Sequence, residues 1–196
     1  MQPRANQKNS FNRALIVASF LLFISAGSVR AQIQDRPKPG AEEKKLELWV
    51  GEWKYEGSVK DTPLGPGGKY AGKQTTRMIM DGLFQERRGE DKGVYGGKEM
   101  AYKWLSIQWF DPGSKSFRDH SYDNDGFAND GITTVTENTW TTNGTTVDKK
   151  GKSYRTRNFS TFASDGKTIV QKGDLSADDG KTWTPFWEGI MKKVSK

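Results

Sequence analysis

The chain has no cysteine and a single histidine, His120, among its 196 residues. The absence of cysteine excludes disulfides, a cysteine nucleophile and a thiolate metal site, so packing alone must stabilise the fold. A lone histidine also excludes a zinc site built from several histidines. We therefore predict no metal site, and the sequence shows no catalytic constellation of the usual kinds.

Long hydrophobic runs are also scarce, and the one present is Ala14 to Gly27. Arg4, Lys8 and Arg13 precede it, and Val29-Arg30-Ala31 places small or apolar side chains at the −3 and −1 positions of a signal-peptidase site. The run is shorter than the roughly 20 apolar residues that a membrane-spanning helix needs. Residues 1–31 are thus predicted to be a cleaved signal peptide of a secreted or periplasmic protein, with no membrane association after cleavage.

A dense basic segment is missing as well. The formal net charge is +7, but four of the 31 Lys and Arg residues lie in the predicted signal peptide, which leaves 27 against 24 Asp and Glu, a net charge of +3. The remaining charges are mixed in sign along the chain. This balance gives no reason to expect a nucleic-acid partner.

Aromatic residues and glycine are plentiful. Phe, Trp and Tyr make up 12% of the chain, with seven Trp, and there are 22 Gly. This combination is typical of an all-β protein, whose strands carry large rings and whose turns need positive φ. Residues 32–40 are polar and aperiodic, which predicts a flexible leader, and residues 41–196 are predicted to form a single β-barrel domain.

The stretch from Leu46 to Val59 combines two kinds of periodicity. Leu46, Trp49 and Val50 have helical spacing, and from Trp53 onward apolar and polar residues alternate strictly. A short N-terminal helix that turns at Gly51 into a half-buried strand is therefore predicted. We expect the helix to lie across one end of a barrel.

Together with the strand that begins at Trp53, about ten alternating segments occur at intervals of roughly 8 to 14 residues, joined by short turns. Asp81-Gly82 is a strong hairpin signal, and turns are also predicted at Asp130-Gly131 and, as a turn or a bulge within one long strand, at Asn143-Gly144. This pattern predicts an antiparallel barrel of about ten strands, with a sandwich as the alternative.

Four motifs together resemble one protein family. They are the Leu-x-x-Trp-Val-Gly-Glu-Trp-x-Tyr-Glu-Gly stretch of residues 46–57, the hairpin of residues 80–86, the Trp-Phe-Asp-Pro turn of residues 109–112 and the hairpin of residues 176–183. The chain is similar to domain-of-unknown-function family 1579, a group of mostly bacterial and often exported proteins. The resemblance implies a calycin-like fold, similar to lipocalins and to the nitrobindin barrel. It implies no particular activity.

Nitrobindin-like barrels can hold haem through a histidine near the C-terminal strand. Residues 183–196 contain no histidine, and His120 lies in the predicted fifth strand. The resemblance therefore does not carry haem binding over to this chain, and no cofactor is predicted.

An interior cavity for a small, largely apolar ligand is the functional hypothesis that the rings support, since small barrels can hold one such molecule. A filled core is the competing interpretation. Arg77 is a further candidate for a polar contact if it faces inward. The predicted ligand-binding residues are Trp53, Tyr55, Met78, Tyr102, Trp104, Arg118 and His120.

A second hypothesis is a hydrolase or isomerase that uses a pocket carboxylate with His120 or Tyr122. Strand alternation places His120 and Tyr122 on one face of their strand and Asp119 and Asp123 on the other, so the acids next to His120 in sequence do not orient it. We therefore favour a non-catalytic binding protein. The sequence does not determine its oligomeric state.

Overall fold

The computed structural model describes residues 36–148 and 150–194. The predicted signal peptide, residues 1–31, and residues 32–35 of the predicted leader lie outside the described residues. Residues 36–40 have no secondary structure, and the compact unit that begins at Lys38 holds all the elements below. No helix in the described part of the chain is long and apolar enough to cross a membrane.

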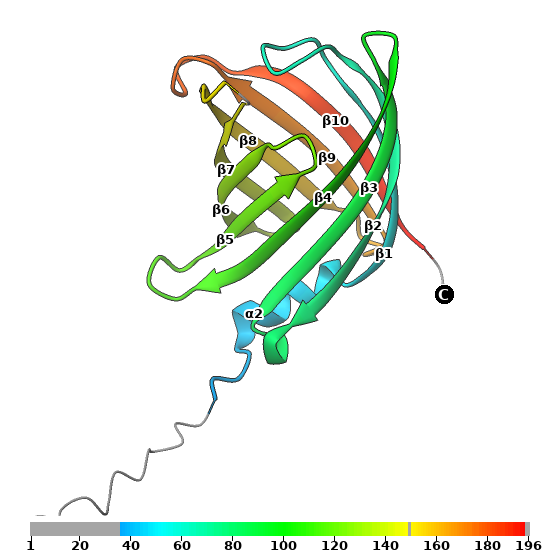
Figure 1. Ribbon diagram of the computed structural model, residues 1–196. Helices are drawn as coiled ribbons and strands as arrows, with labels where there is room; N and C mark the ends of the chain where they lie inside the picture. The colour runs from blue at the N-terminus through cyan, green and yellow to red at the C-terminus, as the bar shows by residue number, and fades with distance from the viewer. Residues whose placement is uncertain (1–35, 149, 195–196) are drawn as a thin grey trace, which may run out of the picture. The chain divides into compact units, whose positions relative to one another are not determined.

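Ten antiparallel strands form a closed barrel (Figure 1). Each strand pairs with the next in sequence, and β1 pairs with β10 to complete the ring. The predicted ten-stranded, all-β barrel with one short N-terminal helix is thereby confirmed, and the sandwich is wrong. The strands are β1 Gly51–Val59, β2 Gly68–Ile79, β3 Phe84–Tyr95, β4 Lys98–Asp111, β5 Ser116–Asp123, β6 Ala128–Thr136, β7 Thr139–Val147, β8 Ser153–Phe162, β9 Thr168–Ser176 and β10 Thr184–Lys193.

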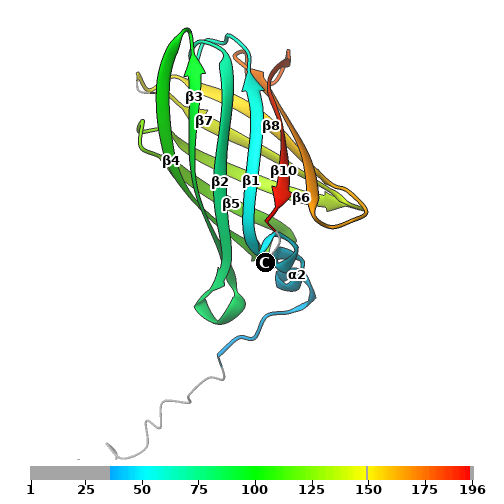
Figure 2. The same cartoon turned by 90° about the vertical axis from the view of Figure 1, so that its right-hand side faces the viewer.

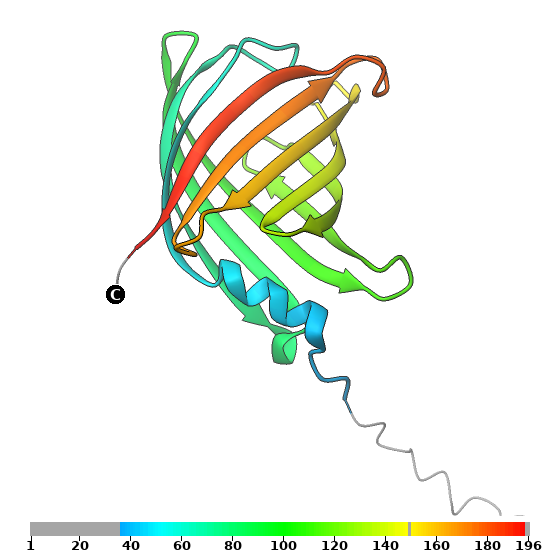
Figure 3. The ribbon, with the colours of Figure 1, turned by 180° about the vertical axis from the view of Figure 1, so that it is seen from behind.

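The N-terminal helix closes one end of the barrel (Figures 2 and 3). It consists of α2, Ala41–Lys45, and a 3₁₀ turn, η1, Leu46–Trp49. The carbonyl groups at the end of such a short helix need partners from elsewhere. Gln85 Nε2 donates to the Leu46 carbonyl at 2.6 Å, and Trp53 Nε1 donates to the Trp49 carbonyl at 2.7 Å. These two bonds fasten the helix to the barrel wall.

The hydrophobic core fills the closed end. Trp49 meets Phe162 edge to face with ring centroids 4.9 Å apart, and Trp140 in the same way at 5.8 Å. Such T-shaped contacts are the favoured arrangement of aromatic pairs. The helix thus forms a plug at this end of the barrel, and the adjoining ends of the strands pack around it. The buried core consists of Leu46, Trp49, Trp53, Phe117, Trp140, Phe162, Ile169 and Met191.

Two glycine dipeptides that resemble turns lie inside strands. The prediction of a turn at Asp130-Gly131 is wrong, because β6 runs through it, and β7 runs unbroken through Asn143-Gly144. Gly131 and Gly144 pair with each other across the two strands. Asp81-Gly82 does form the predicted tight turn, a second 3₁₀ segment, η2, Met80–Gly82, with φ of 58° at Asp81.

Candidate ligand-binding cavity

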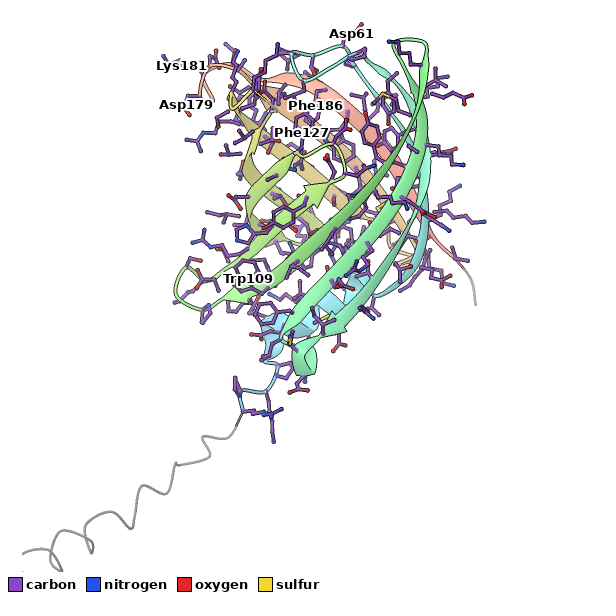
Figure 4. The ribbon with its side chains drawn as sticks, in the orientation of Figure 1. Asp61, Trp109, Phe127, Asp179, Lys181 and Phe186 are labelled. Carbon is purple, nitrogen blue, oxygen red and sulfur yellow. The ribbon has the colours of Figure 1, made fainter. Side chains whose placement is uncertain are left out.

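Above the core, the barrel encloses a cavity of about 670 Å³. Its upper rim includes Leu64 and Pro66 from the β1–β2 loop, Phe127 from the β5–β6 loop and Phe186 of β10. Phe127 and Phe186 lie toward the end of the barrel opposite the helix (Figure 4). A volume of this size lies within the range of small-molecule sites in proteins. The prediction of an interior cavity is met, and the filled core occupies only the closed end.

Five aromatic residues from β1 to β4 form one side of the cavity, and we call them the aromatic wall. Trp104 Nε1 donates to the Tyr55 hydroxyl at 3.1 Å. Ring centroids of Tyr55 and Tyr70 are 6.1 Å apart, and those of Tyr95 and Tyr102 are 5.6 Å apart, both edge to face. The rings therefore hold one another in fixed orientations. The aromatic wall comprises Tyr55, Tyr70, Tyr95, Tyr102 and Trp104.

Glycines on neighbouring strands let these rings lie flat against the barrel. A Cβ at Gly89 would lie 2.2 Å from the Trp104 ring, and one at Gly72 would lie 2.6 Å from Cζ of Tyr55. Gly57 in the same way leaves room for Tyr70, whose hydroxyl would be 2.5 Å from its Cβ. Any larger residue would push a ring toward the barrel axis. The glycines thus keep the interior open.

The opposite side of the cavity, from β6 to β10, carries amides and hydroxyls, together with the rings of Phe186 and Trp187 on β10. Asn158 Oδ1 accepts a hydrogen bond from Trp187 Nε1 at 3.0 Å, and Gln171 Nε2 donates to Ser160 Oγ at 3.0 Å. Thr146 and Thr156 add hydroxyls to this side. The cavity is therefore amphipathic: rings dominate the side from β1 to β4, and most of the amides and hydroxyls lie on the other side.

Asp91 of β3 is a carboxyl group set in the aromatic wall. It lies opposite Tyr102 in the β3–β4 register, and the Tyr55 hydroxyl donates to its Oδ2 at 3.1 Å. Burial raises the pKa of Asp91, and the nearby charge of Asp123 raises it further. Burial likewise raises the pKa of the Tyr55 phenol above its usual range. The Tyr55 phenol therefore stays neutral and acts as a ring and a hydrogen-bond donor rather than as a base.

A second charged group, an ion pair, lies deeper in the cavity. Arg87 Nη2 donates to Asp119 Oδ2 at 2.5 Å and to Ser106 Oγ at 3.1 Å, and Ser106 Oγ donates to the same carboxylate at 2.6 Å. The guanidinium also lies over the Trp49 ring, 5.4 Å from its centroid. Arg87 is thus committed to Asp119 and to the plug of the barrel.

The family comparison matches this barrel from one end to the other. The model of the family described as "Protein of unknown function (DUF1579)" matches residues 38–193. The chain belongs to the DUF1579 family. No curated protein matches it.

Solved structures similar to this DUF1579 barrel are barrels of distant sequence. Rv2717c from M. tuberculosis is 12% identical, with a TM-score of 0.56 over 80% of this chain and 99% of that one. The S-type phycobiliprotein lyase CPES from Guillardia theta is 11% identical, with a TM-score of 0.51 over 82% of this chain and 95% of that one. At such identities the similarity extends to the fold alone.

Of the seven predicted ligand-binding residues, three line the cavity of the DUF1579 barrel: Tyr55, Tyr102 and Trp104. Trp53 and Met78 also face inward but lie in or against the core at the closed end. Trp53 is completely buried, and its indole N–H donates a hydrogen bond to the Trp49 carbonyl of the helix. These two residues support the cavity from below rather than line it.

Arg118 and His120 lie on the outer face of β5, which corrects the expectation that they face inward. Arg118 Nε donates to Asp111 Oδ2 at 3.3 Å, and His120 Nδ1 contacts Asp130 while its ring stacks on Trp109. The alternation of β5 turns its acidic residues inward and these basic ones outward. Arg77 is likewise outside, paired with Glu86.

The outward position of His120 leaves the interior without an imidazole, since the chain has no other histidine. The cavity therefore offers no histidine to a haem iron. Among the described residues, no group of three or more His, Asp or Glu side chains could hold a metal ion. Tyr122 is half exposed, on the same side of β5 as His120.

Sequence reasoning missed Asp91, Tyr95, Tyr70 and the Arg87–Asp119 pair. Gly93, Gly96 and Gly97 suggest a loop soon after Glu90 and so conceal Asp91 and Tyr95, whereas β3 continues to Tyr95. Tyr70 shares the inward phase of Met78 on β2 and could have been found by alternation. The pairing of Arg87 with Asp119 joins strands that are not neighbours, so no local signal could have indicated it.

Proposed function

We propose that this protein binds a small molecule inside the barrel and carries out no chemistry on it. The observation that carries the proposal is the open cavity of about 670 Å³ beside the aromatic wall. A wall of rings offers a large apolar contact area at little conformational cost, and the opposite polar side can fix a ligand's orientation. The ligand is thus expected to have one flat apolar face and a polar edge.

The arrangement of titratable groups favours binding over catalysis. His120, one of the partners named in the hydrolase or isomerase hypothesis, lies on the outer face of β5, stacked on Trp109. Tyr122, the other, is half exposed and only borders the cavity. Arg87 and Asp119 neutralise each other. A general base must reach the proton that it abstracts, and within the cavity only carboxylates could serve. The enzymatic alternative would have to use the Tyr55–Asp91 hydrogen bond, in which burial keeps the phenol neutral by raising its pKa.

Native mass spectrometry of the protein purified from its own host tests the proposal. We expect a mass increment that persists under gentle ionisation and disappears on denaturation. In parallel, the neutral dye Nile red is expected to bind at one site with a blue-shifted emission, because the aromatic wall excludes water from one of its faces. A protein that shows no adduct and no saturable dye binding would contradict the proposal.

We also propose that the protein acts outside the cytoplasm. The proposal is supported by the basic residues and apolar run of residues 4–27. The protein recovered from the periplasm or culture medium is expected to begin at Gln32, and N-terminal sequencing measures this. Protein that is found only in the cytoplasm, with Met1 retained, would refute this export.

A further inference from the structure

We propose that the cavity selects an organic cation, an amine or quaternary ammonium group held by Asp91 against the aromatic wall. This inference rests on the proposed function, because it names the chemical class of the ligand that occupies the same cavity. It goes beyond that function by giving one residue, Asp91, the role of recognising charge.

Asp91 is a carboxylate with no positively charged partner among the described residues. Within residues 36–148 and 150–194, no Lys, Arg or His forms an ion pair with it, and its one hydrogen bond comes from the Tyr55 hydroxyl at 3.1 Å. Its neighbours Glu90 and Lys92 alternate to the outer face, where Glu90 pairs with Lys73 at 2.8 Å. A half-buried carboxylate of this kind is costly unless it is paired. A cation in the cavity would supply the missing partner.

The rings stand in one row with this carboxylate. Tyr55 lies opposite Gly72, Gly72 opposite Asp91, and Asp91 opposite Tyr102 across β1 to β4. Because Gly72 has no side chain, the Tyr55 ring lies over it and its hydroxyl reaches Asp91. Tyr70 and Tyr95 occupy the next positions toward the rim. Aromatic faces arranged around a site attract ammonium groups through their quadrupoles.

The net charge of the side chains that line the cavity also favours a cationic ligand. Arg87 is the one basic residue among the described residues that line it, and Asp119 already neutralises that charge. Asp91 and Asp123 remain on the inner face, and Asp125 and Asp130 also border the cavity, where Asp130 contacts His120. Asp123 uses Oδ1 to accept backbone N–H groups of Asp125 and Phe127. The interior thus carries a net negative charge. An anionic ligand would meet repulsion from Asp91 and Asp123 and would have to displace Asp119 to reach Arg87.

Three related compounds of different charge test the inference: phenyltrimethylammonium, its neutral carbon isostere tert-butylbenzene, and 4-tert-butylbenzoate, which adds an anionic carboxylate to the ring of the neutral isostere. Binding is followed by NMR titration of the Trp104 indole N–H signal in the intact protein. We expect the cation to bind about tenfold more tightly than the neutral isostere, and the anion to bind most weakly. Cation–π attraction and one unscreened charge pair are sufficient for a difference of this size.

Two variants then assign the preference to Asp91. D91N is expected to remove most of the cation's tenfold advantage while leaving the affinity for tert-butylbenzene unchanged. E90Q removes a charge from the adjacent residue on the outer face and serves as the matched control, with no change for any of the three compounds. The neutral isostere also reports whether D91N preserves the cavity.

The results for the three compounds, the variants and Nile red separate the cation preference from the binding function. If the neutral compound binds as tightly as the cation in the unaltered protein, or if D91N keeps the preference, the cation inference is wrong and the binding function stands. The same holds if Nile red binds and none of the three compounds does. If native mass spectrometry shows no adduct and neither Nile red nor any of the three compounds binds, both proposals fail together.

Discussion

Replacing Trp53 with alanine is expected to lower the free energy of unfolding by about 3–5 kcal/mol, the usual loss for a large aromatic side chain deleted from a core. Trp53 is completely buried, contacts Phe162 edge to face with centroids 6.4 Å apart, and donates from Nε1 to the Trp49 carbonyl. The substitution would leave a cavity and also free the helix plug. Since domains of this size are stable by only about 5–15 kcal/mol, this loss is severe.

Urea unfolding followed by circular dichroism measures the effect, with a lower midpoint and an unchanged slope. Trp109→Ala is the matched control. Trp109 lies on the outer face, stacked on His120 with centroids 5.2 Å apart, so a loss of about 1 kcal/mol is expected, as for other aromatic pairs. An equal loss in the two variants would mean that the core does not lie where the structure places it.

Gly89→Ala is expected to weaken Nile red binding at least tenfold, which corresponds to about 1.4 kcal/mol. The added methyl group would lie 2.2 Å from the Trp104 ring, so the ring must swing into the cavity and break its hydrogen bond to Tyr55. Overpacking of this kind is also expected to cost about 1–3 kcal/mol of stability. Fluorescence titration measures the affinity, and urea unfolding measures the stability.

Two further variants separate ring displacement from general damage. Gly113→Ala adds the same methyl group in the β4–β5 turn, where its nearest contact is a flexible side-chain oxygen of Asp111 at 3.2 Å, and binding should not change. Combining Gly89→Ala with Trp104→Ala removes the displaced ring and is expected to recover part of the cavity. A double variant that binds no better than Gly89→Ala alone would show that the ring does not block the site.

The two predictions rest on one design of the interior. The closed end is filled with large rings, and the open end keeps its rings against the wall because glycines lie beneath them. The same residue types, Trp, Tyr and Gly, thus make a core in one half of the barrel and a cavity in the other. Which half a residue belongs to depends on its distance from the helix plug and not on its chemistry.

Much of the fold was predictable because strand alternation and turn chemistry are local. The period of two from Trp53 onward fixed which side chains of β1 share a face, and Asp81-Gly82 gave a hairpin at the right place. Tyr55, Tyr102 and Trp104 followed from the same alternation. The errors at Asp130-Gly131 and beyond Glu90 arose because glycine in a strand, where it makes room for a neighbouring side chain such as Thr142 beside Gly131 or Tyr95 beside Gly93, has the same local signature as glycine in a turn.

The amino-acid sequence by itself therefore determined the class of fold, the approximate number of strands and which residues of a strand share a face, since these depend on neighbours along the chain. Only the tertiary structure decided that Trp53 belongs to the plug and Tyr55 to the cavity, and that Arg118 and His120 face outward. It also decided that Asp91 lies among rings with no ion-pair partner in the described part of the chain. Those outcomes depend on which strands close the barrel and on where the helix lies across it, and contacts of that kind join residues far apart in the chain.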